Sequence, residues 1–309
     1  MGLFNFGKKQ PTQAPTPAPK APVKSRPDPG GKNNFIIVIL DSCRYDSFVK
    51  ADPKIITKLG AVEKRFSYAS WTAPSHYNLL MGLVPHTSPP QVFASEYYKE
   101  DFFNYNKRLG SDGIEFAKLI PSLYLPIYLK ETLGYYTHAR VSLPVLNAKT
   151  PINHGFDSFQ LMDKHNDMAA MLETMTFDDD RPSFYLLNVG ETHYPYATPD
   201  EDPSEWPRIS GVHGVFKHLD DNIVGGELQA GEDKFFDQDK LDTLRSRQIN
   251  TVNYLDDVFE RLYDLVPQNT WIIVTADHGE LFGEEGYFGH GPIQHPMVYE
   301  VPYMEGMRP

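Results

Sequence analysis

Residues 35–40 read FIIVIL, and Asp41 follows them directly. Six consecutive apolar residues, most of them β-branched, are typical of a strand that is buried on both faces of a sheet. Two later stretches follow the same pattern, SFYLLNV at residues 183–189 and WIIVTA at residues 271–276. All three are followed by polar residues. Because parallel sheets place their ligand sites at the carboxyl ends of strands, we expect these polar residues to form one site.

Helical patterns lie between the predicted strands. Residues 72–81 follow a helix-start signal, and residues 241–265 carry apolar side chains on one broad face. A further helix is predicted over residues 114–134. Strands that alternate with helices predict an α/β fold with a mostly parallel central sheet and helices on both faces.

The composition excludes several classes of protein. The chain has 309 residues, enough for one large α/β domain, and a net charge of -12. Such an acidic chain is not expected to bind nucleic acid, because that partner favours a basic face. Cys43 is the single cysteine, so an intramolecular disulfide is excluded.

The chain divides into a tail and a folded domain. Residues 1–33 are rich in Pro and Ala, a composition that predicts a disordered tail because it buries little apolar surface. The domain is expected over residues 34–309, with an insertion rich in Asp, Glu, Gly and Pro at about 200–239. The sequence shows neither a secretory signal nor an apolar run of about 18 residues. We therefore expect a cytoplasmic protein without an integral membrane segment.

Two of the predicted strand ends carry metal-ligand residue types. Asp41 follows the first strand, and Asp277 and His278 follow another. Two carboxylates and an imidazole at adjacent strand ends predict a site for a divalent cation, with Zn²⁺ or Mn²⁺ as the first candidates and Ca²⁺ or Mg²⁺ as alternatives. Taken singly, each motif also fits an ordinary turn or cap.

The stretch SWTAPSH at residues 70–76 places Thr72 near the start of a helix, where free backbone N–H groups favour an anion. A bound cation lowers the pKa of a coordinated hydroxyl, so Thr72 is a candidate nucleophile. The alternative is a plain helix start with Thr72 as its N-cap. His76 is a candidate for binding a substrate oxygen or a residue of the helix surface.

Two more histidines lie in loops. His193 lies between Glu191 and a Tyr-Pro-Tyr sequence, and His290 lies between two glycines. Glycine and proline indicate tight loops that present side chains. A lone loop histidine is usually structural, but both of these are expected at the same cleft as the strand ends.

Seven short motifs together resemble the sulfatase branch of the alkaline phosphatase superfamily, and they occur in the order found in that family. They cover almost the whole chain from Asn34 onward. The motifs are VILDSCRYD at 38–46, SWTAPSH at 70–76, GYYT at 134–137, GFDSF at 155–159, THYPY at 192–196, TADHGE at 275–280 and GHG at 289–291.

The resemblance implies a role for each matched residue. The residues it places around a metal ion are Asp41, Thr72, Asp277 and His278. It implies that His193 and His290 act in catalysis by contacting substrate oxygens, or help to hold a second metal, for which Glu191 would be an imperfect partner. Glu191 is also a candidate for binding the substrate. One firmly bound metal is therefore expected, with a second left open. Arg44 and Asp46 would support the site from behind it.

The sequence departs from true sulfatases at the nucleophile. Sulfatases carry Cys or Ser there, modified to formylglycine, and an Arg four residues later; here these positions are Thr72 and His76. Threonine cannot form formylglycine. The resemblance therefore points to the phosphodiesterases, phosphonate hydrolases and phosphoethanolamine or phosphoglycerol transferases of the superfamily.

We accordingly expect a metal-dependent hydrolase or transferase that acts on a small-molecule or lipid-like phosphoester through a covalent phospho-threonine. Two alternatives remain open from the sequence. One is a sulfatase-like enzyme that acts on sulfate esters without formylglycine. The other is a catalytically inactive binding module of the same fold. Neither the substrate nor the oligomeric state is predicted.

Overall fold

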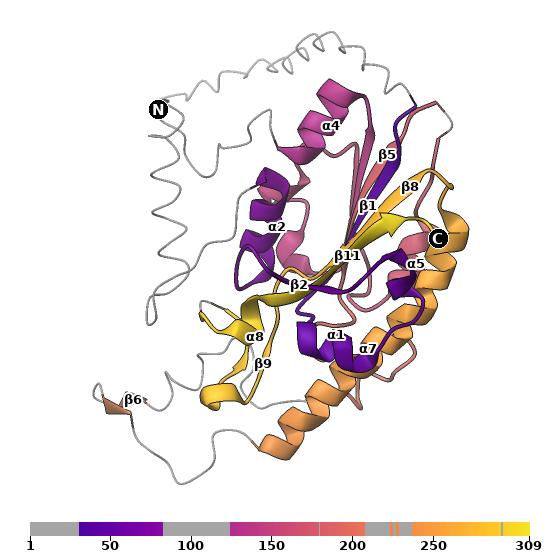
Figure 1. Ribbon diagram of the computed structural model, residues 1–309. Helices are drawn as coiled ribbons and strands as arrows, with labels where there is room; N and C mark the ends of the chain where they lie inside the picture. The colour runs from indigo at the N-terminus through magenta and orange to yellow at the C-terminus, as the bar shows by residue number, and fades with distance from the viewer. Residues whose placement is uncertain are drawn as a thin grey trace, which may run out of the picture.

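The computed structural model describes residues 31–82, 124–178, 180–207, 223–224, 227–228, 237–291 and 293–309. Within these ranges one seven-stranded sheet forms the centre of the molecule, in the order β2-β11-β8-β1-β5-β3-β4 (Figure 1). Its strands are β1 (Asn34–Leu40), β2 (Glu63–Phe66), β3 (Tyr136–Val141), β4 (Ser158–Leu161), β5 (Ser183–Val189), β8 (Thr270–Thr275) and β11 (Glu300–Met307).

The sheet is mostly parallel. β1 pairs in parallel with both β5 and β8, and β3 pairs in parallel with β5 and β4. β11 is antiparallel to its neighbours β8 and β2. The first strand of the chain thus lies in the middle of the sheet, between strands that come much later in the sequence. Two-stranded hairpins are formed by β9 (Leu281–Phe282) with β10 (Phe288–Gly289) and by β6 (Ile223–Val224) with β7 (Glu227–Leu228).

Helices cover both faces of the sheet (Figure 1). On one face Ile37 and Ile39 of β1 pack in a core with α2 (Thr72–Met81) and α4 (Leu125–Leu133). On the other face Ile36, Val38 and Leu40 pack in a core with three further helices. These are α1 (Tyr45–Ala51), α5 (Met168–Glu173) and α7 (Gln238–Leu265). Alternate residues of β1 therefore pack into the cores on the two faces of the sheet, which explains its continuous apolar sequence.

Short elements complete the described part of the chain. α8 (Pro296–Tyr299) precedes β11. The 3-10 helices are η1 (Ile56–Leu59), η3 (Pro144–Leu146), η4 (Pro151–Asn153) and η5 (Glu284–Gly286). Gly82 and Gly134 end α2 and α4 with φ of 68° and 79°, a left-handed conformation that glycine adopts without steric cost.

The predicted fold class is confirmed, and the three predicted strands match β1, β5 and β8 to within one residue. The helix predicted over 72–81 matches α2. The helix predicted over 241–265 begins three residues earlier, at Gln238. Of the helix predicted over 114–134, the described part is α4, and residues 114–123 lie outside the described residues.

Two predicted regions fall largely outside the described residues. These are the tail of residues 1–33, of which only 31–33 are described, and the insertion at about 200–239, of which 200–207, 223–224, 227–228 and 237–239 are described. In the part of the chain that the structure describes, no helix is both long and apolar enough to cross a membrane.

Candidate active site

The carboxyl ends of β1 and β8 bring three metal-ligand side chains together. Asp41 follows β1 at once, and Asp277 and His278 follow β8 after one intervening residue. Each of the three offers a ligand atom, and these atoms lie within 4.8 Å of one another. All three residues are buried. Parallel pairing of the two strands is what places residues 41 and 277 side by side.

The Asp277 carboxylate has one engaged and one unpartnered oxygen. Its Oδ1 accepts hydrogen bonds from the backbone N–H groups of Ser42, at 3.1 Å, and His278, at 3.0 Å. Its Oδ2 is buried without a hydrogen-bond partner and lies 3.4 Å from Nε2 of His278. Buried polar atoms in proteins are nearly always partnered, so this oxygen fits a place at a bound cation.

The pKa shifts of the three residues fit the same conclusion. Burial raises the pKa of Asp277 well above its ordinary value, and the nearby Asp41 raises it further. Burial would also raise the pKa of Asp41, but His193 and His278 outweigh it and lower that pKa. Burial lowers the pKa of His278 well below its ordinary value. The lowered pKa keeps the His278 imidazole neutral, and a divalent cation would offset the repulsion between the two carboxylates that raises the pKa of Asp277, so these residues fit a metal.

Thr72 points its hydroxyl into this cluster. Its Oγ1 lies 3.4 Å from Oδ1 of Asp41 and 3.3 Å from Nε2 of His278. Thr72 is the first residue of α2, and Trp71 occupies the N-cap position. The hydroxyl therefore does not cap the helix, and the N-terminus of α2 adds a favourable field for negative charge beside it.

Asn188, on the neighbouring strand β5, holds Asp41 in place. Its Nδ2 donates to Oδ2 of Asp41 at 2.7 Å and faces Nε2 of His76 at 3.4 Å. Its Oδ1 accepts from the backbone N–H groups of Ser142 and Leu143 at 3.2 and 3.1 Å. Asn188 thus connects the metal-ligand cluster to the loop that follows β3.

His76 lies beneath the cluster, fully buried. Its Nδ1 donates to the backbone carbonyl of Thr72 at 2.8 Å, and its Nε2 faces the amide of Asn188. Both ring nitrogens are engaged, and burial lowers the pKa of this residue. His76 is therefore not a residue of the helix surface; it is buried under Thr72, and its part in substrate binding stays a prediction.

Gln248 of α7 ties two site loops together. Its Nε2 donates to the backbone carbonyls of Ser42, at 2.9 Å, and Thr192, at 3.1 Å. The hydroxyl of Thr192 in turn donates to the backbone carbonyl of Asp41 at 2.7 Å. These hydrogen bonds fix the loops after β1 and β5 to each other and to helix α7.

The two loop histidines lie next to each other at the cluster. The ring centroid of His290 is 4.1 Å from that of His278 and 5.5 Å from that of His193. Nδ1 of His290 is 2.9 Å from Oε1 of Glu280, and Nδ1 of His193 is 2.9 Å from the backbone carbonyl of Tyr194. Burial would lower the pKa of His290, but Glu280 outweighs it and raises that pKa.

Arg44 and Asp46 form a partly buried ion-pair network next to the site. The Arg44 guanidinium, 2 % exposed, donates to both oxygens of Asp46 at 2.7 Å and to Oε1 of Glu284 at 2.5 Å. Asp46 also accepts from Arg245 of α7. Arg44 further donates to the backbone carbonyl of Glu280 at 3.3 Å, so the network braces the loop that carries the site residues.

Glu191 is not part of the metal-ligand cluster. Its Oε1 accepts from the backbone N–H of Met168, at the start of α5, at 2.7 Å, and its Oε2 is buried without a hydrogen-bond partner. Burial raises its pKa to about 7. The structure thus directs Glu191 toward α5 and does not bring it to Asp41, Asp277 and His278.

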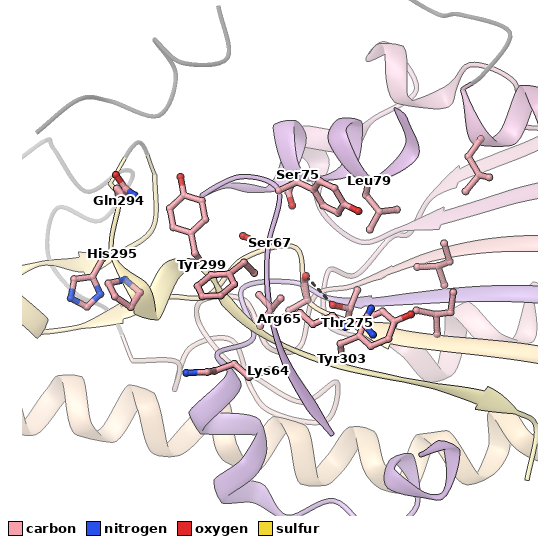
Figure 2. Close-up of a pocket in the computed structure, with 18 residues that line it drawn as sticks. Lys64, Arg65, Ser67, Ser75, Leu79, Thr275, Gln294, His295, Tyr299 and Tyr303 are labelled. Carbon is pink, nitrogen blue, oxygen red and sulfur yellow. Dashed lines mark hydrogen bonds between the residues drawn. The ribbon is translucent and has the colours of Figure 1, made fainter. Parts of the chain in front are cut away.

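A cavity of about 830 Å³, whose lining side chains are drawn in Figure 2, does not include Asp41, Asp277 or His278. Ser75 of α2 and Thr275 of β8 line it together with residues of β2 and β11. The hydroxyl of Ser75 donates to the backbone carbonyl of Asp277 at 2.5 Å, so the cavity and the cluster share a wall. None of the predicted metal-binding or catalytic side chains lines this cavity.

Four residues that the structure places in the site were not predicted from the sequence. They are Asn188, Tyr196, Gln248 and Glu280. Each carried a signal: Asn188 is a polar residue in an apolar strand, Gln248 falls on the apolar face of a helix, and the other two lie inside recognised motifs. A polar residue at a position predicted to be buried indicates a partner that must be sought.

A mostly parallel α/β sheet with a carboxylate and histidine site at the carboxyl ends of its strands is the alkaline phosphatase-like fold. The sulfatase family model matches residues 33–304, and the chain belongs to the sulfatase family.

A curated relative is the low-salt glycan biosynthesis sulfotransferase Agl7 of Haloferax volcanii. It is 23% identical over 292 residues, which cover 91% of this chain and 56% of the relative. The chain therefore spans only about half the length of this relative.

Two solved structures of periplasmic domains share the fold. The C-terminal periplasmic domain of phosphoethanolamine transferase EptC from Campylobacter jejuni has a TM-score of 0.50 at 13% identity, with 89% of this chain and 78% of that chain covered. The corresponding domain of EcEptC from Escherichia coli, in complex with Zn, has a TM-score of 0.53 at 11% identity, with 93% and 77% covered. At these identities the likeness shows the fold alone.

Proposed function

We propose that this chain is a metal-dependent transferase or hydrolase that acts on a phosphorus ester, with Thr72 as its nucleophile. The observation that carries the proposal is the position of the Thr72 hydroxyl. Its Oγ1 lies within 3.4 Å of both Asp41 and His278, at the start of α2. A hydroxyl beside metal-ligand side chains and a helix N-terminus is suited to attack a centre with anionic oxygens.

Asp41, Asp277, His278 and Thr72 would hold the cation. The cation would lower the pKa of the threonine hydroxyl and offset charge on the ester oxygens. Zn²⁺ and Mn²⁺ suit a set of carboxylate and imidazole ligands. The zinc complex of a protein with the same fold supports the first of these.

His290 and His193 would contact the oxygens of the reacting group. The rings of His193 and His290 are 5.5 Å apart, and the ring of His290 is 4.1 Å from that of the metal-ligand residue His278. Oγ of Thr72 would form the new bond to phosphorus while the bond to the leaving alcohol breaks. Water or an acceptor alcohol would then release the phosphoryl group from Thr72.

Phosphorus is preferred over sulfur because threonine cannot form formylglycine. The name of one relative with this fold, a phosphoethanolamine transferase, agrees with that preference. Transfer or hydrolysis of a sulfate group is the second candidate. It is favoured by the sulfatase family match and by the sulfotransferase among the relatives.

The test combines metal content with a substrate panel. Purified protein is analysed for bound metal, loaded with Zn²⁺ or Mn²⁺, and assayed on an aryl phosphodiester, a phosphomonoester, a phosphonate monoester and an aryl sulfate. Thr72→Val removes the hydroxyl with little change of shape, and Thr243→Val on the exposed face of α7 is the matched control. Acid-quenched enzyme is examined by mass spectrometry for a phosphorylated or sulfated peptide containing Thr72.

Turnover of a phosphorus ester that is lost in Thr72→Val and kept in the control supports the proposal. Preferential turnover of the sulfate, with a sulfated Thr72, supports the second candidate. Thr72→Val with full activity refutes the nucleophile in either case. A metal-loaded protein that is inert on the whole panel favours a binding module.

A further inference from the structure

Glu280 occupies a position in which both carboxylate oxygens are engaged by named partners. It lies on the loop after β8 and is 2 % exposed. Its Oε1 faces Nδ1 of His290 at 2.9 Å, and its Oε2 accepts the hydroxyl of Tyr196 at 2.8 Å. A buried carboxylate with two partners is fixed in orientation, because loss of either contact would leave a charged oxygen unpaired.

Tyr196 is itself held firmly. Its ring is fully buried and packs with Leu241 and Leu244 of α7 and with Phe282 and Phe288 of the β9–β10 hairpin. Its φ of 58° is in the left-handed region, which is unfavourable for a bulky residue. The surrounding packing therefore imposes a strained backbone that aims the hydroxyl at Glu280.

The contact with Glu280 determines which nitrogen of His290 remains for a ligand. His290 carries a proton on Nδ1, because the ionised carboxylate of Glu280 can accept a hydrogen bond but cannot donate one. Nε2 is then the nitrogen left to face a substrate. The ring lies 4.1 Å from that of His278 and 5.5 Å from that of His193, which places it at the metal-ligand cluster.

We propose that Glu280, held by Tyr196, is a positioning residue that fixes the orientation and the tautomer of His290 so that Nε2 faces the oxygens of the reacting ester. This inference rests on the proposed function insofar as His290 contacts the substrate. Glu280 acts through His290 and touches neither the ester nor Thr72. A purely structural carboxylate would stabilise the fold without affecting the histidine's chemistry.

The first experiment does not depend on turnover. In the metal-loaded full chain, a hydrogen bond from Nδ1 to a carboxylate gives a low-field imidazole proton in the NMR spectrum. We expect such a resonance in the wild type and its loss in both His290→Ala and Glu280→Gln. Tyr263→Phe is the matched control, because the buried Tyr263 hydroxyl donates to the backbone of Ile55 and not to a site residue. If no low-field signal depends on His290, the inference is overturned.

The second experiment is a double-mutant cycle with the best ester of the panel. Glu280→Gln should lower kcat by about 10- to 100-fold with little change in KM or metal content. Tyr196→Phe should lower it in the same direction by less. In a His290→Ala background, Glu280→Gln should cause no further loss, because its effect passes through the histidine.

Provided that the variants fold, two results would overturn the inference. One is a Glu280→Gln enzyme with a kcat within about twofold of the wild type. The other is a full loss that persists in the His290→Ala background. Failure of the proposed function is separate, because it appears as absent turnover or as an active Thr72→Val variant and leaves the NMR result to decide the role of Glu280.

Discussion

Asp277 should destabilise the metal-free protein and stabilise the metal-bound one. Its Oδ2 is buried without a partner, 3.4 Å from Nε2 of His278, while Oδ1 keeps two backbone hydrogen bonds. In Asp277→Asn the oxygen can keep both bonds, and the new amide N–H can donate to Nε2 of His278. That nitrogen carries no proton when Nδ1 donates to the carbonyl of Gly279 at 2.9 Å, so it could accept from the amide in place of the Thr72 hydroxyl, which lies 3.3 Å from it.

The size of the effect follows from the burial of this oxygen. A buried polar group without a partner costs about 1–3 kcal/mol, so the metal-free variant should be more stable than the wild type by that order. An unfolding entropy of about 2.1 cal/mol/K per residue over roughly 270 residues converts this to a rise in Tm of about 2–5 °C. A cation at about 100 to 1,000 times its Kd should stabilise the wild type by about 3–4 kcal/mol, or about 5–7 °C, and should scarcely affect the variant.

The order of the two Tm values should therefore invert on metal addition. Thermal unfolding is followed for both proteins with a chelator and then across a titration of Zn²⁺ or Mn²⁺. The variant should melt higher in chelator and the wild type higher at saturating metal. A variant that is the less stable protein in chelator, or an equal rise of both Tm values with metal, would refute the assignment of Asp277 as a metal ligand.

Three further outcomes are expected. Burial raises the pKa of Glu191 from 4.5 to about 7, so the native protein keeps a proton that the unfolded chain releases. Stability should therefore fall by about 3 kcal/mol as the pH rises from about 4.5 through 7, and urea unfolding of Glu191→Gln at pH 5 and pH 8 should show no such loss. Gly279→Ala would place its Cβ 2.0 Å from the backbone oxygen of Met297, so a loss of about 3 kcal/mol is expected, and an unchanged Tm would contradict it. Gln248→Leu leaves buried carbonyls unpaired, including that of Ser42, and should cost about 1–3 kcal/mol and weaken metal binding in calorimetry; unaltered metal affinity would show that this tie does not shape the site.

The centre of the sheet could be predicted from the sequence because its strands are buried on both faces. β1, β5 and β8 are mostly apolar runs of six or seven residues, a length typical of buried strands and short for a helix. β11 could not be predicted in this way, since it contains Pro302 and Gly306, residues that argue against a strand inside a sheet. Its place between β8 and β2 is decided by tertiary pairing, which local propensity does not encode.

The candidate site was predictable where strand ends define it and unpredictable where distant elements support it. Asp41 and Asp277 follow recognisable strands, so their convergence follows from parallel pairing. Gln248 reaches the site from α7, and a single sequence shows only that it is a polar residue on an apolar face. The direction of Glu191, toward α5 rather than toward the cluster, depends on a loop conformation that no spacing reveals.

The central place of β1 also sets a condition on the synthesis of the protein. β1 leaves the ribosome well before its partners β5 and β8, which begin at residues 183 and 270. Contacts between segments so far apart in sequence form late and slow the folding of a chain. Until then the apolar first strand needs protection from aggregation, such as a chaperone gives. Asp277 and His278 follow β8, so capture of a cation by a nascent chain would report that β8 has paired with β1.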